Sequence, residues 1–90
     1  MKKLDILIHK RESVAKRTME LEETDDDFEL GTAFIDLKEV QSINSANDFW
    51  KGRGIFFLYL SATSYTIVGD MAQLAEEVER VKTYHILGIN

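Results

Sequence analysis

Two neighbouring runs of apolar and aromatic residues restrict the fold of this chain more than any other feature. Residues 55–60 read Ile-Phe-Phe-Leu-Tyr-Leu, residues 65–68 read Tyr-Thr-Ile-Val, and Ser-Ala-Thr-Ser separates them. Aromatic and β-branched residues favour strands, and a short polar spacer favours a reversal of the chain. The runs therefore predict a β-hairpin. Because every position of the first run is apolar, both faces of its strand must be shielded from water.

A helix is predicted after this hairpin, over residues 71–86. Apolar residues recur there at spacings of three and four, at Met71, Leu74, Ala75, Val78 and Val81. Asp70 followed three residues later by Gln73 resembles a capping box, which marks a helix start. Glu76 and Arg80 are spaced for an ion pair on the polar side, and Gly88 can end the helix.

Three further segments carry strand patterns. Residues 3–10 alternate around Leu4, Ile6 and Ile8, and residues 33–37 alternate before a bend that leads to Val40 and Ile43. We also predict a strand over 13–23, although Val14, Thr18 and Leu21 fit helical spacing equally well.

Two segments of the sequence indicate loops. Residues 22–27 contain no apolar residue and predict a solvated turn. Residues 44–54 hold two glycines and several turn-forming polar residues, and they predict a long surface loop.

These elements predict an α+β fold in one domain over residues 1–90. A bent antiparallel sheet of four or five strands should span about 3–68, with the C-terminal helix packed on one face. One helix covers only one face of the doubly apolar strand at 55–60. Its other face requires the rest of a curled sheet, the tail 86–89 or a second molecule, and the size of the chain, 90 residues, favours self-association.

Composition excludes several classes of protein. A net charge of −5 argues against direct nucleic-acid binding. The longest uninterrupted apolar run, 55–60, is far shorter than the ~20 residues of a membrane span. Because the chain has no cysteine and the N-terminal sequence lacks the pattern of an export signal, we expect a cytoplasmic protein.

The loop around Phe49 and Trp50 is the first candidate binding site. It combines large aromatic rings with the cationic Lys51 and Arg53 between glycines, a composition typical of interaction hot spots. Trp50 could instead pack over the end of the core. The apolar strand adds two candidate contacts to this partner-binding set, Phe56 and Leu58.

The acidic segment is the second candidate. Residues 20–29 carry seven acids and no base. The acidic surface would consist of Glu20, Glu22, Glu23, Asp25, Asp26 and Asp27. A calcium loop is not predicted, because Leu30 occupies the position that requires glycine. Such a surface suits attraction of a basic partner.

No catalytic, cofactor or metal site is predicted. The two histidines, His9 and His85, are expected on different elements as surface groups, and no serine lies in a nucleophile-elbow pattern. The leading expectation is a non-enzymatic interaction or assembly module that forms a homodimer and binds another protein. The alternative is a small acidic inhibitor, or nucleic-acid mimic, that binds a basic surface.

Overall fold

The structure of the protein is a computed structural model that describes the backbone of residues 1–19 and 21–88 and the side chains of residues 1–16, 19 and 21–82. The strands are β1 (Lys2–His9), β2 (Phe28–Ile35), β3 (Val40–Trp50), β4 (Arg53–Leu60) and β5 (Ser64–Val68). The helices are α1 (Val14–Thr18) and α2 (Met71–Gly88), with short 3-10 turns at Arg11–Ser13, Asp25–Asp27 and Leu37–Glu39.

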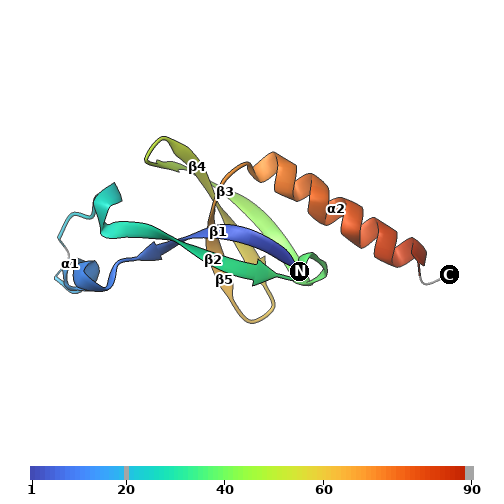
Figure 1. Ribbon diagram of the computed structural model, residues 1–90, viewed down its shortest axis with the longest axis horizontal. Coiled ribbons are helices and arrows are strands. Elements are labelled where there is room, and N and C mark those ends of the chain that lie inside the picture. The colour runs from blue at the N-terminus through green and yellow to red at the C-terminus, as the bar shows by residue number, and fades with distance from the viewer. Residues whose placement is uncertain (20, 89–90) are drawn as a thin grey trace.

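The strands form one five-stranded antiparallel sheet in the order β2-β1-β5-β4-β3. β1 lies inside the sheet because it pairs with β2 along its whole length and with β5 at Ile6↔Ile67. The predicted hairpin is β4 and β5, with Phe56 opposite Ile67. With α2 after the sheet (Figure 1), this arrangement confirms the predicted α+β fold.

The main core lies between the sheet and α2. Leu74 and Val78 of the helix are buried with Phe56, Leu58 and Ile67 of the sheet. Asp70 accepts a hydrogen bond from the Gln73 amide at 3.1 Å, which confirms the Asp70 half of the predicted capping box. The Lys82 ammonium also donates to the carbonyl oxygen of Val40, and this bond ties α2 to the start of β3.

The second face of β4 is only partly covered. Alternation along the strand places Ile55, Phe57 and Tyr59 opposite Phe56 and Leu58. The sheet does not close, because β2 and β3 are its two edges and do not pair with each other. Ile55 and Phe57 are half-buried and Tyr59 is exposed. The side chains of the tail 86–89 lie outside the described ones.

The strand predicted over 13–23 is wrong. Arg11–Ser13 forms a 3-10 turn and Val14–Thr18 a short α-helix, which Figure 1 shows at one end of the molecule. The segment lies in the connection between β1 and β2, and it cannot pair with β1 because β2 and β5 occupy both sides of that strand. The helical spacing of Val14 and Thr18 therefore prevailed.

The long loop predicted over 44–54 is also wrong. β3 runs to Trp50 and β4 begins at Arg53, so that only Lys51 and Gly52 form the turn. Both have left-handed φ values, 48° and 78°, as in the tight turns that suit a twisted hairpin. β3 is an edge strand with two bulges. Edge strands of this kind carry many polar residues, so the composition of β3 is similar to that of a loop.

Candidate interaction surfaces

The fold brings the aromatic segment and the acidic segment into direct contact. The Trp50 indole Nε1 donates to the carbonyl oxygen of Asp25 at 2.9 Å, and the Lys51 amide donates to the Asp25 carboxylate at 2.9 Å. The Lys51 ammonium lies 5.1 Å from the Trp50 ring centre and 3.7 Å from Asp26. The turn between β3 and β4 is thereby anchored to the turn before β2, and the sheet curls.

Trp50 is buried within the fold and is therefore not an accessible binding hot spot. It is only 8% exposed, and its one polar group is satisfied by Asp25. Arg53 extends from the same face of the hairpin to Asp5 of β1, with 3.8 Å between Nη2 and the carboxylate. Both contacts hold the hairpin over the face of the sheet that α2 does not cover.

The structure divides the predicted partner-binding set into two groups. Phe56 and Leu58 are 2% and 0% exposed inside the core of this chain, so they cannot contact a partner while the fold is intact. Lys51 and Arg53 remain about half exposed. Phe49, next to the buried Trp50, is 66% exposed and is the apolar member of the set that a partner can contact.

The acidic segment is not a uniformly solvated turn, because Asp27 is buried. Its carboxylate contacts the Lys16 ammonium at 3.0 Å and accepts a hydrogen bond from the Thr24 amide at 2.7 Å and another from the Ser13 hydroxyl. The Lys10 amide donates to the Asp27 carbonyl oxygen. These hydrogen bonds, from Thr24 first, then Lys16 and Ser13, hold the pKa of Asp27 far below its ordinary value.

Other members of the acidic segment are also engaged within the chain. Glu23 lies 2.6 Å from Nε2 of His9, whose side chain is only 10% exposed and packs edge-on against Phe28. The expectation that His9 is a surface group is therefore wrong. Asp25 anchors the β3–β4 turn, whereas Glu22 and Asp26 remain exposed. Glu20 and the side chain of His85 lie outside the described residues.

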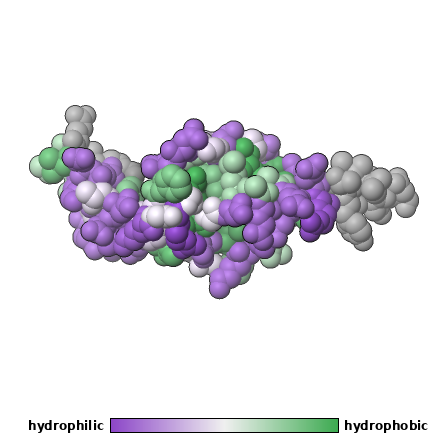
Figure 2. All heavy atoms as spheres, turned by 90° about the horizontal axis from the view of Figure 1, so that it is seen from above, coloured by the Kyte–Doolittle hydropathy of each residue, from purple (hydrophilic) through white to green (hydrophobic). Residues whose placement is uncertain are grey.

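An exposed apolar row on β2 was not among the predicted sites. Phe34 is 66% exposed and Leu30 is 43% exposed, with the exposed Thr32 between them on the same face of the strand. Apolar side chains reach the surface among hydrophilic ones in Figure 2. The signal was present in the sequence, because both alternating sets of 30–35 contain large apolar residues, as in β4.

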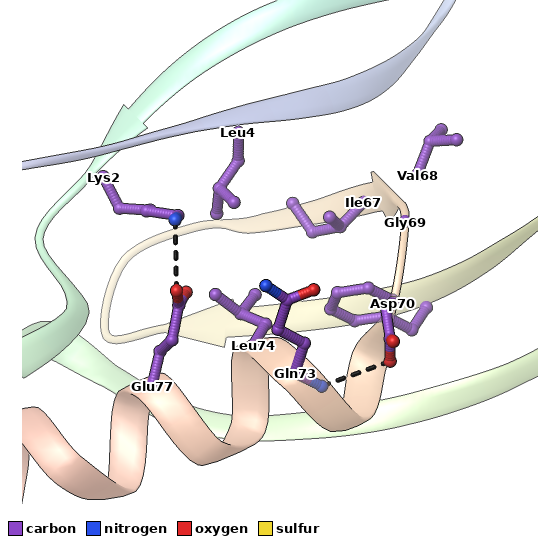
Figure 3. A pocket seen from close by; sticks show the side chains of 10 residues that line it. Lys2, Leu4, Ile67, Val68, Gly69, Asp70, Gln73, Leu74 and Glu77 are labelled. Atoms are coloured by element: carbon purple, nitrogen blue, oxygen red, sulfur yellow. Dashed lines mark hydrogen bonds and ion pairs between the residues drawn. The ribbon is translucent and has the colours of Figure 1, made fainter.

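A small pocket lies between β1, β5 and the first turns of α2 (Figure 3). It has a volume of about 140 Å³ and an apolar lining that includes Leu4, Ile67 and Leu74. Its rim carries Lys2 and Glu77, which pair with each other at 3.2 Å. Ligand pockets commonly measure ~300–1,000 Å³. The size of this one, and a rim whose charges are already paired, favour a packing gap over a ligand site.

Within the residues that the structure describes, no three histidine, aspartate or glutamate side chains gather where they could hold a metal ion. Asp25 and Asp27 have other partners: the Asp25 carboxylate accepts from the Lys51 amide in the hairpin turn, and the Asp27 carboxylate contacts Lys16. None of the described helices is both long and apolar enough to cross a membrane.

Comparison with protein-family models, curated proteins and solved structures found no match for this chain.

Proposed function

We propose that this chain is a non-enzymatic protein-interaction module that associates with itself. The observation that carries the proposal is the exposure of two phenylalanines, Phe34 and Phe49, each 66% exposed in the folded chain. Burying a phenylalanine side chain contributes roughly 1.5–3 kcal/mol. Exposed apolar side chains that lie close together, as Leu30 and Phe34 do on β2, are typical of surfaces that bind another protein.

The two phenylalanines lie on different elements of the sheet, β2 and the end of β3. Phe49 lies beside Lys51, whose ammonium is near Trp50 and Asp26, so this site mixes an apolar ring with charge. Phe34 belongs to the apolar row on an edge strand. Two separate sites are consistent with a module that pairs with itself through one surface and binds another protein through the other.

The proposal includes a cytoplasmic location, because a chain without cysteine suits a reducing compartment. It includes no direct nucleic-acid contact, because a net charge of −5 opposes phosphate binding. Phe34 belongs to the apolar row of β2, whereas Phe49 follows Asp48 and lies near the acidic segment. The proposed contacts of both rest on apolar burial.

The solution mass tests the self-association. Light scattering over a concentration series, at low and high salt, should give a dimer or larger species whose population rises with concentration. Apolar burial predicts little weakening by salt. A mass that stays monomeric at the highest concentration, in both salts, would contradict the self-associating part of the proposal.

The acidic inhibitor has weaker support. Asp27 is buried, Glu23 contacts His9 and Asp25 anchors the hairpin turn. Among the acids that the structure describes in this segment, Glu22 and Asp26 are therefore the most available. A test of this alternative must leave Asp27 unchanged, because Asp27 is buried and its replacement would destabilise the fold. Replacing Glu22 and Asp26 with their amides should abolish binding to a basic partner under this alternative, and unchanged binding would reject it.

A further inference from the structure

The outer edge of β2 lacks the features that protect an edge strand from pairing. β2 pairs with β1 alone among the described elements, and their register runs from Lys2↔Ile35 to His9↔Phe28 without a bulge. The strand contains no proline, lysine or arginine, and its one charge is Glu29. Unpaired N–H and C=O groups on a long regular edge are a template for another strand.

The opposite edge is different. β3 is interrupted by two register shifts, between Val40 and Ser42 and between Ser45 and Asp48, and Asn47 has a φ of 51°. Bulges and left-handed residues bend an edge and disturb its ladder of hydrogen bonds. Of the two edges, β2 is the one prepared for strand addition.

We infer that β2 pairs antiparallel with β2 of a second copy, which joins two five-stranded sheets into one continuous sheet about a two-fold axis at Thr32. This inference rests on the proposed self-association and names its surface. A two-fold axis normal to the sheet does not exchange the two faces of the sheet. A residue of one copy must therefore lie opposite a residue of the other copy whose side chain is on the same face. Thr32 opposite Thr32 of the second copy satisfies that rule.

This register matches the exposed side chains with each other. It places Leu30 of each copy opposite Phe34 of the other, twice by symmetry, and these are the exposed large apolar residues of the strand. Residues directly opposite each other on neighbouring strands have Cβ atoms about 4.5–5.5 Å apart. Each exposed ring therefore gains an apolar neighbour that its own chain does not supply.

Charge also favours a second copy in the antiparallel direction. The end of β2 that begins at Phe28 carries more exposed acids than exposed bases, with Glu22, Asp25, Asp26 and Glu29 against Arg11 and Lys51. The other end carries both signs, with Lys3 and Lys38 near Asp36 and Glu39. Antiparallel pairing places the acidic end of one copy beside the mixed end of the other. Parallel pairing would place the acidic ends side by side, and like charges repel.

Single-cysteine variants test the register directly, because the chain has no cysteine of its own. Thr32→Cys places a thiol at the proposed two-fold axis. Under mild oxidation, or with a short thiol cross-linker, it should form a covalent dimer on a non-reducing gel. Ser42→Cys, also exposed but on the β3 edge, is the matched control and should remain monomeric. Equal cross-linking of both variants, or of Ser42→Cys alone, would overturn the inference.

A second pair of variants separates this surface from the other exposed phenylalanine. Phe34→Ser should raise the dimer dissociation constant about tenfold or more, whereas Phe49→Ser, equally exposed at 66%, should change it less than about twofold. Circular dichroism should show both variants folded. If Phe49→Ser alone weakens the dimer, the β2 surface is wrong and self-association stands. If the unaltered chain is monomeric at the highest concentration and Thr32→Cys does not cross-link, both fail.

Discussion

The indole Nε1 of Trp50 donates a hydrogen bond of 2.9 Å to the carbonyl oxygen of Asp25. These residues lie at opposite sides of the sheet, because Trp50 ends the edge strand β3 and Asp25 begins the turn before the other edge strand, β2. The bond thus connects the two edges at one end of an open sheet. It also explains why the ring is buried next to the exposed Phe49.

Replacing the Trp50 indole should destabilise the chain in proportion to what is removed. Trp50→Phe keeps a six-membered ring but removes the Nε1 donor and part of the buried indole, and it should lower the free energy of unfolding by about 1–3 kcal/mol. Trp50→Ala should lower it by about 3–5 kcal/mol because a buried aromatic side chain is lost. Chemical denaturation measures both. The neighbouring Phe49→Ala should cost less than about 0.5 kcal/mol, and an equal loss there would contradict the assignment of Trp50 as the covering residue.

Asp27 should make the stability depend on pH in the acid range. Its pKa is lowered in the folded chain by hydrogen bonds from Thr24, Lys16 and Ser13, so the ionised form stabilises the fold. That contribution is complete above the ordinary pKa of 3.8 and declines as the pH falls below it. Denaturation at a series of pH values should show this loss.

Asparagine variants provide the control for this prediction. Asp27→Asn should be less stable than the unaltered chain at pH 7, and the difference should shrink as the pH falls, since both side chains are then uncharged. Asp26→Asn, whose side chain is 88% exposed, should leave the pH dependence unchanged. The assignment fails if Asp26→Asn flattens the curve and Asp27→Asn does not.

Gly31 should resist replacement because Ile8 occupies the space above it. A methyl group at Gly31 would overlap the Ile8 side chain, which reaches it from β1. Ile8 is 41% exposed and can turn its side chain away, so Gly31→Ala should cost no more than about 1 kcal/mol, and Ile8→Ala in the same chain should recover that loss. A double-mutant cycle measured by denaturation gives the coupling, and additive effects would show that Ile8 does not fill this space.

Gly52 should be required for the turn between β3 and β4. Glycine adopts its φ of 78° readily, whereas other residues are strained there. No atom lies near enough to hinder an added side chain, so the backbone angle is the limiting factor. Gly52→Ala should therefore cost about 1 kcal/mol through the backbone alone. Gly54→Ala is the comparison in thermal unfolding, because Gly54 has no left-handed φ and an added methyl group would make only an ordinary contact, 3.6 Å from the carbonyl oxygen of Gly69. Equal melting temperatures for the two variants would contradict this reason.

Local patterns predicted β1, β4, β5 and α2. The apolar run at 55–60, the spacing from Met71 to Val81 and the cap at Asp70 each depend on residues close in the chain, and the structure has β4, α2 and the Asp70–Gln73 hydrogen bond there. The α+β class followed from the same patterns. Their physical basis is short-range, since periodicity decides which face of an element is apolar.

Relations between distant residues could not be predicted in this way. Residues 13–23 fitted helix and strand equally, and in the structure Val14–Thr18 is a short helix whose Lys16 contacts the distant Asp27. Asp27 resembles its acidic neighbours in the sequence, yet it alone among the described ones is buried against Lys16 and Ser13. The polar composition of 44–50 suggested a loop because an edge strand has the same composition.

Periodicity and capping residues in the chain were enough to define a bent antiparallel sheet with one helix, because those signals act over a few residues. The tertiary structure decided which candidate side chains a partner can contact. Trp50, Phe56 and Leu58 became covered, whereas Phe34 and Phe49 stayed exposed. The reason is that exposure depends on which strands become neighbours and which edges remain open, and those pairings join residues far apart in sequence.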